Sequence, residues 1–116
     1  MKKLFVFLFL FMAVMFEFCS SSKKTSKTPP PPPKVTYQAR VQSIVMATCS
    51  PCHVGPTAKQ KALNTYDQVK VNIDDIITRI NKNPTDRGFM PFKHPKLPDS
   101  TIQVFVKWRN DGLLNM

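Results

Sequence analysis

Cysteine is scarce in this sequence, and two kinds of hydrophobic pattern are absent from it. Its 116 residues include 3 cysteines, too few for a disulfide framework that would staple a small core. The apolar run at residues 4–16 is shorter than the roughly 20 residues that a membrane-spanning helix needs. Residues 35–116 contain no convincing strand pattern, which disfavours folds built from alternating strands and helices. Domains of this size often need a staple, so we expect something other than protein to complete the core.

Acidic residues are also few. The chain has 7 of them against 17 lysines and arginines, a formal net charge of +10. Residues 35–116 keep eleven basic and six acidic residues, a net charge of +5. The basic residues are scattered rather than clustered, which disfavours nucleic acid as a partner. The remaining excess favours an acidic docking surface on a partner protein.

The first 34 residues are typical of targeting and linker segments. Residues 1–18 combine two lysines with the apolar run and predict a signal peptide, and Cys19 then stands at the cleavage boundary. This arrangement resembles a bacterial lipoprotein signal, which implies a lipid on Cys19 and a location on the periplasmic side of a membrane. Glu17 and Phe18 stand where small residues are usual, so cleavage within residues 20–22 and an uncleaved anchor are the alternatives. Residues 19–34 predict a tether, which ends in a stiff proline run.

The residues that indicate chemistry are Cys49, Cys52 and His53, in the pattern Cys-x-x-Cys-His. Two thiols three residues apart on a helical turn can each add to one haem vinyl group, and the adjacent imidazole can then bind the iron. The pattern therefore predicts one covalent c-type haem. The alternatives are a redox-active dithiol, a structural disulfide, and a zinc site that would also use His94.

A haem held in this way has a sixth iron position, for which Met90 is the preferred ligand. Gly88 permits a tight approach of the chain, and Phe89 and Phe92 can pack on the macrocycle. His94 is the rival ligand, and a bis-histidine haem would have a lower reduction potential. We interpret His94 as a solvated loop residue.

Hydrophobic spacing predicts helices on both sides of the motif. Residues 37–48 form the first, with Thr36 as a possible N-cap, and residues 63–69 a weaker segment. The third predicted helix carries isoleucines at 73, 76, 77 and 80 and ends at residues 83–84. The last begins near residues 99–100 in a capping box on Ser100, has Trp108 as a core residue, and stops at Gly112.

Residues 35–114 resemble a class I cytochrome c domain. The residues that carry the resemblance are the helix ending in Cys49-Ser50-Pro51-Cys52-His53, the segment at 63–66, Met90-Pro91, and the closing helix at 97–112. The resemblance implies an all-α fold wrapped around one covalent haem, with the first and last helices crossing near it and Met90 opposite His53.

From these residues we expect an electron carrier with no catalytic residues, whose partners are redox proteins and a membrane. The alternatives are a ligand-binding or peroxidase-like haem protein with a labile sixth position, and a thiol redox protein without haem. Residues 1–18, 19–34 and 35–116 are the expected signal peptide, tether and cytochrome domain.

Overall fold

The computed structural model of the protein describes residues 30–58 and 61–116. Its compact unit comprises Pro32–Met116. The predicted signal peptide, Cys19 and most of the predicted tether lie outside the described residues. Among the described residues, no helix is long and apolar enough to cross a membrane.

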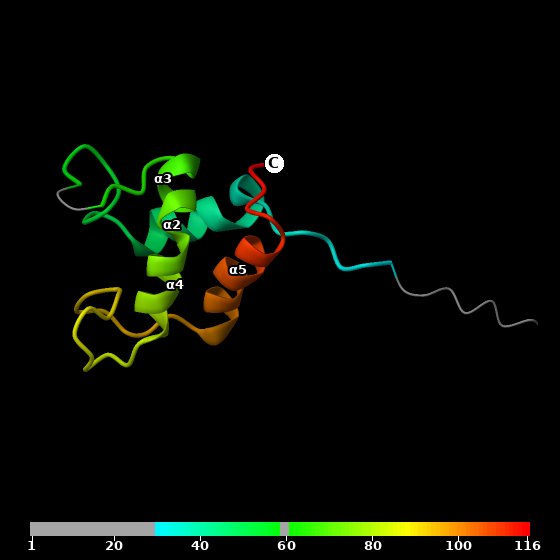
Figure 1. Ribbon diagram of the computed structural model, residues 1–116. Helices are drawn as coiled ribbons and strands as arrows, with labels where there is room; N and C mark the ends of the chain where they lie inside the picture. Colours follow the sequence, from blue (N-terminus) through cyan, green and yellow to red (C-terminus); the bar gives the residue numbers. More distant parts are fainter. Residues whose placement is uncertain (1–29, 59–60) are drawn as a thin grey trace, which may run out of the picture. The chain divides into compact units, whose positions relative to one another are not determined.

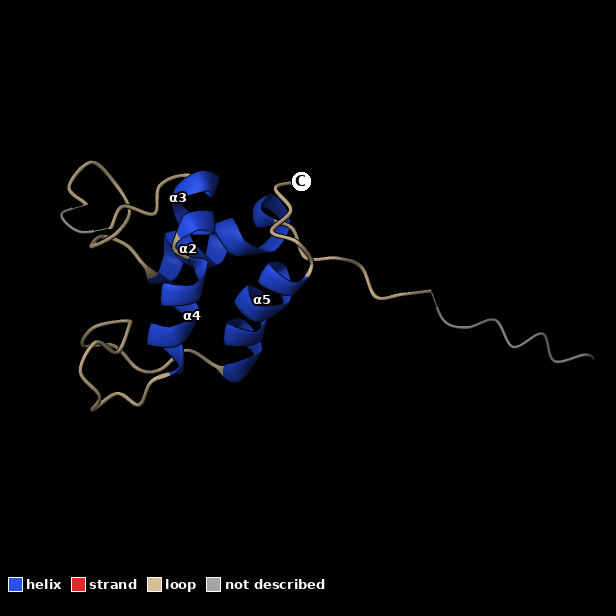
Figure 2. Cartoon of the chain, in the orientation of Figure 1, coloured by secondary structure: helices blue, strands red, loops and turns tan. Residues whose placement is uncertain are grey.

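Helices make up the regular structure of the described residues, which contain no strand beyond one isolated bridge (Figures 1 and 2). The all-α part of the sequence prediction is therefore confirmed for this part of the chain. The elements, in chain order, are the π-helical turn η2 (Tyr37–Val41) and the α-helices α2 (Gln42–Thr48), α3 (Tyr66–Val71), α4 (Ile73–Asn81) and α5 (Asp99–Asn110).

The first predicted helix is confirmed as η2 followed directly by α2. Thr36 is its N-cap, as predicted, because the hydroxyl oxygen of Thr36 accepts a hydrogen bond from the Ala39 amide at 3.4 Å. The first turn is π-helical rather than α-helical, a detail that the spacing did not predict. Thr48 is the last residue of α2 and Cys49 is its C-cap, so the helix leads straight into the Cys-x-x-Cys-His motif.

The middle of the chain folds as two short helices. The weaker predicted segment is α3, and its start is a capping box: the Thr65 hydroxyl accepts from the Gln68 amide, and the Gln68 side chain accepts from the Thr65 amide. We missed this signal in the sequence. Helix α4 was predicted correctly, and its four isoleucines are all buried. These side chains form the α4 face that packs into the core.

The predicted capping box of α5 is wrong. Its N-cap is Pro98, without a side-chain hydrogen bond, and Ser100 lies inside the helix. The proline starts the helix instead, because its carbonyl oxygen accepts from the amides of Thr101 and Ile102 at 2.9 and 3.1 Å. Gly112 is the C′ residue, as predicted. It has φ +96° and donates to Arg109, while the next amide donates to Trp108, which completes a Schellman motif.

Trp108 lies in the core, on helix α5, which contacts η2. Its side chain has no exposed surface, and its ring packs against Tyr37 and Tyr66 with centroid distances of 5.8 and 6.2 Å. The indole Nε1 donates to the Leu114 carbonyl at 2.8 Å, so burial leaves no polar group unpaired there. The prediction that Trp108 is a packing residue is confirmed. This cluster joins the first helix to the last.

Asp111 holds the two ends of the compact unit together. One of its carboxylate oxygens accepts from the Val35 amide at 2.6 Å, and both accept from the Lys107 ammonium at 2.9–3.0 Å. The Val35 amide, and after it the Lys107 ammonium, lowers the pKa of the Asp111 carboxyl. The charged carboxylate is therefore favoured in the folded state, although its side chain is only 15% exposed.

We expect Asp111→Asn to lower the free energy of unfolding at neutral pH. We also expect the free energy of unfolding of this variant to fall less steeply than that of the wild type as the pH is lowered. A lowered pKa stabilises the fold above the unfolded value of about 3.9, and this contribution is lost as pH falls through the folded value. Urea unfolding of the full chain at pH values from 7 to about 2.5 measures both effects. Asp67→Asn, at an exposed position of α3, is the control. If the free energy of unfolding of the Asp111→Asn protein fell with decreasing pH as steeply as that of the wild type, this account would be contradicted.

Candidate functional site

A cavity of about 470 Å³ collects the residues that the sequence singled out. Cys49, Cys52, His53, Met90 and His94 all line it. Their segments are up to 45 positions apart in the sequence, so the fold and not the chain order brings them together. The volume lies in the range of about 300–1,000 Å³ that is usual for pockets that bind small molecules and cofactors.

The rest of the cavity wall is mainly apolar. Helix α4 contributes Ile76 and Ile80, which are buried with the Phe105 ring of α5. Leucine, proline and phenylalanine from the loop between these helices complete the wall, and the residues concerned are Pro91, Phe92 and Leu97. A wall of this kind favours a large, flat, apolar ligand with few polar groups.

The Cys49–His53 segment is a helical turn beyond the end of α2. The His53 amide donates to the Cys49 carbonyl at 2.9 Å, which gives the turn an α-helical hydrogen bond. Cys49 is half-buried and Cys52 is exposed, and both thiols are free. Burial raises the pKa of the Cys49 thiol, and a contact with the Thr48 hydroxyl at 3.7 Å partly opposes this rise. Cys49 is therefore a neutral thiol at neutral pH.

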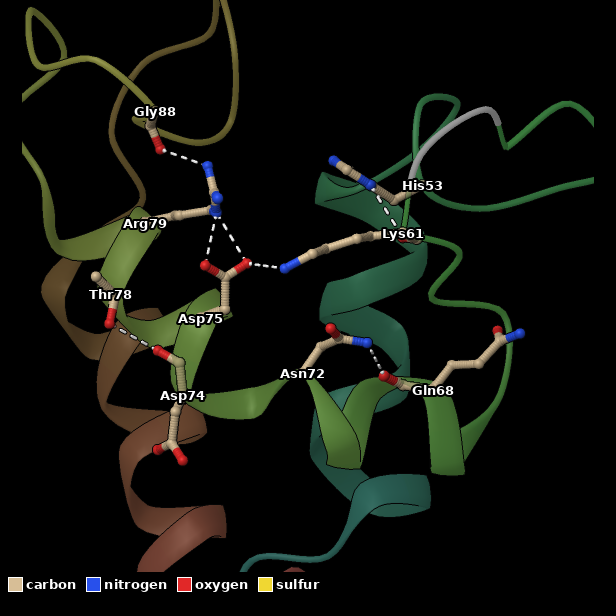
Figure 3. Close-up of polar contacts among 9 residues, drawn as sticks. All are labelled: His53, Lys61, Gln68, Asn72, Asp74, Asp75, Thr78, Arg79 and Gly88. Carbon is tan, nitrogen blue, oxygen red and sulfur yellow. Dashed lines mark hydrogen bonds and ion pairs between the residues drawn. The ribbon is translucent and has the colours of Figure 1, made fainter.

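The ring of His53 is oriented by a backbone carbonyl. Its Nδ1 atom lies 3.1 Å from the carbonyl oxygen of Lys61 (Figure 3). A carbonyl oxygen can only accept, so Nδ1 carries the proton, and a neutral imidazole then has its lone pair on Nε2. This is the usual state of a histidine that binds a metal, whose other nitrogen donates to a neighbouring acceptor. Lys61 has φ +35°, an uncommon conformation for a residue with a side chain.

The Met90 segment is held by α4. The Met90 amide donates to the Arg79 carbonyl at 3.3 Å, and the Arg79 guanidinium donates to the Gly88 carbonyl at 3.4 Å. Gly88 has φ +83°, and a Cβ atom there would stand 3.1 Å from the guanidinium. The tight approach expected at Gly88 is therefore one to the side chain of Arg79.

The two phenylalanines near Met90 lie in different surroundings. Phe92 is 66% exposed and lines the cavity, where a bound ligand could cover its ring. Phe89 is buried but is not among the residues of the cavity wall. Packing on a ligand in the cavity is therefore available to Phe92 and not to Phe89.

A second, smaller cavity of about 160 Å³ distinguishes Met90 from His94. Cys49, His53 and Met90 line both cavities, whereas His94 lines only the larger one and is exposed. Met90 is half-buried and packs against the core. It therefore shares its surroundings with the motif more closely than His94 does.

Sequence reasoning missed the three charged residues that line the smaller cavity, namely Lys61, Asp75 and Arg79. Asp75 accepts from the Lys61 ammonium at 2.7 Å and from Arg79 Nε at 2.9 Å (Figure 3). The four-residue spacing of Asp75 and Arg79 on a helix was the one available signal. Lys61 lies 14 residues before Asp75, and nothing in its sequence surroundings indicates the contact.

Two alternatives to haem, a zinc site and a reactive dithiol, can be weighed against this geometry. The described residues contain no group of three or more His, Cys, Asp or Glu side chains placed to hold a metal ion. Cys49 lies at the C-terminal end of α2 with a raised pKa. Reactive dithiols have the opposite environment, with a lowered pKa that is often supplied by a helix N-terminus.

The residues present fit a covalently attached haem. Two thiols, an imidazole with its lone pair on Nε2 and a thioether meet at one apolar cavity. Each is a group that attaches or ligates such a cofactor. Comparisons of the chain with protein-family models, with curated proteins and with solved structures find no match.

Proposed function

We propose that the protein is an electron carrier with one covalently bound c-type haem, of the class I cytochrome c type. The observation that supports this most strongly is the meeting of Cys49, Cys52, His53 and Met90 at one apolar cavity. The rest of the proposal follows from what these four side chains can do.

Cys49 and Cys52 attach the cofactor. Each thiol adds across one vinyl group, so that the sulfur bonds to one carbon and the thiol proton goes to the other. Nothing is oxidised or reduced in this addition. The exposed Cys52 and the half-buried Cys49 would then hold the group at the cavity, whose apolar wall includes Ile76 and Ile80.

His53 and Met90 are the proposed axial ligands. The bound haem supplies a one-electron couple between ferric and ferrous iron. The Lys61 carbonyl fixes the orientation of the His53 ring, and the Arg79 carbonyl fixes the backbone of Met90. With both positions occupied by protein there is no place for a substrate, which favours electron transfer over catalysis. A thioether ligand stabilises ferrous iron and raises the reduction potential.

Location and partners are also part of the proposal. A lipid on Cys19 would anchor the chain on the periplasmic side of a bacterial membrane, with residues 19–34 as the tether. The net charge of +5 on residues 35–116 would suit a redox protein with an acidic docking surface, in an encounter that salt weakens. Nucleic acid is not an expected partner.

The experiment that tests this function is the absorption spectrum of the full chain, made together with haem attachment machinery and purified in detergent. We expect a Soret band, a sharp alpha band on reduction, and haem that stays on the chain after denaturation. Cys19→Ala is the control, because it should lose the lipid and keep the haem. A colourless protein with two titratable thiols, or with a disulfide between them, would refute the proposal.

A further inference from the structure

Asp75, on α4, pairs with one residue of a loop and with one residue of its own helix. Its carboxylate accepts from the ammonium of Lys61 at 2.7 Å and, with both oxygens, from Arg79 Nε at 2.9 Å (Figure 3). Lys61 belongs to the loop that follows the Cys-x-x-Cys-His motif, and Arg79 belongs to α4. We refer to Lys61, Asp75 and Arg79 as the Asp75 cluster.

On one side, the Asp75 cluster reaches His53. The Lys61 residue whose ammonium binds Asp75 also accepts the Nδ1–H of His53 with its carbonyl oxygen, at 3.1 Å. Its φ of +35° is costly for a residue with a side chain and persists only when the surroundings impose it. In this conformation Lys61 makes both the ion pair with Asp75 and the hydrogen bond with His53. A change at the ammonium would therefore be transmitted to the carbonyl that orients the ring.

On the other side, the cluster reaches Met90. The guanidinium that binds Asp75 also donates to the Gly88 carbonyl at 3.4 Å, and the Arg79 carbonyl accepts from the Met90 amide at 3.3 Å. Asp75 therefore orients the side chain that holds the segment just before Met90. Without the carboxylate, the guanidinium would lose its charged partner and its fixed position against Gly88.

The cluster also borders the site directly. Its three residues line the smaller cavity together with His53 and Met90. The side chain of Asp75 is 36% exposed, and its hydrogen bonds with Arg79 are partly buried, whereas the one with Lys61 is exposed. Arg79 and then Lys61 lower the pKa of the Asp75 carboxyl, which keeps it charged at neutral pH. Partly buried, charge-assisted hydrogen bonds of this kind position their partners more firmly than neutral ones.

We infer that Asp75 is a positioning residue that holds the two axial ligands in register, by fixing Lys61 behind His53 and Arg79 behind Met90. This inference depends on the proposed function, because it assigns a role toward a haem between those two residues. Asp75 acts only through its neighbours. Its loss should loosen the weaker ligand, the thioether, before it affects the covalent attachment.

The test uses the haem-loaded full chain carrying Asp75→Asn, which removes the charge and keeps the shape. We expect covalent haem at the wild-type level, a weaker sulfur-to-iron charge-transfer band, and faster binding of carbon monoxide to the reduced protein. The expected increase is about 10- to 100-fold, the range that loss of an outer-shell partner typically produces at metal sites. Stopped-flow absorption measures the rate. Asp75→Glu, which keeps the charge, should restore most of the wild-type behaviour.

The chain offers a matched control in Asp74→Asn. Asp74 is the preceding residue on α4, but its side chain is 79% exposed and pairs with Arg109 of α5 at 3.0 Å, away from the cluster (Figure 3). It makes the same change of charge without pairing with Lys61 or Arg79. We expect a wild-type rate of carbon monoxide binding from it.

A second variant, Lys61→Met, removes only the ion pair between Lys61 and Asp75, on the His53 side of the cluster. It leaves the backbone carbonyl of Lys61 in place. Its ammonium-bearing side chain is 54% exposed, so the change should not unfold the domain. We expect it to raise the carbon monoxide rate as well. If Asp75→Asn and Lys61→Met both carry covalent haem and both bind carbon monoxide at the wild-type rate, the inference is wrong while the proposed function stands. A wild-type protein without haem would remove the proposed function itself.

Discussion

The full chain carrying both Cys49→Ala and Cys52→Ala is expected to lose most of its native helicity. The reason is the cavity of about 470 Å³, which lies against Ile76, Ile80 and Phe105. Side chains that line an unfilled cavity lack packing partners, which is costly for a small domain whose whole stability is about 5–15 kcal/mol. Exposed residues at its mouth admit water, so the effective cost is on the order of several kcal/mol.

Several kcal/mol is enough to unfold this domain, because its helices are short. Helices α2 and α3 have 7 and 6 residues and would not be stable in isolation. They depend on tertiary packing, and a haem in the cavity would add apolar surface next to Ile76 and Ile80 of α4. Filling the cavity is therefore expected to be a condition for folding rather than an addition to a finished fold.

Circular dichroism of the double variant, after removal of any loosely bound haem, measures this loss. The single variants Cys49→Ala and Cys52→Ala are the matched controls. Each removes one of the same two sulfurs but leaves one thioether, so each should keep bound haem and most of the helicity. Full native helicity in a haem-free double variant would show that the protein core is sufficient by itself.

Hydrophobic spacing predicted the helices whose buried side chains repeat at helical intervals along the sequence. The four isoleucines of α4 repeat at helical intervals, and packing then buries all four. The start of α5 near residue 99 was predicted correctly, but its cap was not, because Ser100 and Gln103 have the spacing of a capping box. The fixed backbone of Pro98 competes with that signal and sets the first turn two residues earlier. In α3, the corresponding pattern at Thr65 and Gln68 was a true cap that we overlooked.

The residues of the candidate site likewise fall into those that the sequence revealed and those that it did not. Cys49, Cys52 and His53 could be found because they lie in one short motif, and Met90 because few other thioethers were available. Lys61 could not be found in the sequence, because its contacts with Asp75 and His53 are tertiary, whereas Asp75 had only its four-residue spacing from Arg79 as a signal. A charged residue on a helix is usually on a solvated face, and only the fold shows that Asp75 also pairs with Lys61 of the loop after the motif.

Met90→Ala is expected to change the properties of the haem-loaded protein, whereas His94→Ala is expected to leave them unchanged. Met90→Ala should abolish the sulfur-to-iron charge-transfer band and open the sixth position to rapid carbon monoxide binding. It should also lower the reduction potential by on the order of 100 mV, a fraction of the about 0.8 V that axial ligands control. His94→Ala should leave all three properties unchanged.

The expectation comes from how each side chain is held. Met90 is half-buried, its backbone is bonded to Arg79, and it lines both cavities with His53. His94 is exposed and lines only the larger cavity, next to Lys93, whose φ is +61°. A ligand that starts in water must give up its hydration and order its loop before it can bind, whereas the Met90 thioether is already desolvated.

Near-infrared absorption, redox titration and carbon monoxide kinetics on the two variants separate the possibilities. The reverse pattern, in which His94→Ala opens the iron and Met90→Ala does not, would assign the sixth position to His94 and predict a bis-histidine carrier of lower potential. Rapid carbon monoxide binding to the haem-loaded wild-type protein would be a third result. It would mean that the Asp75 cluster does not hold Met90 on the iron, and that the sixth position is labile enough to admit a ligand.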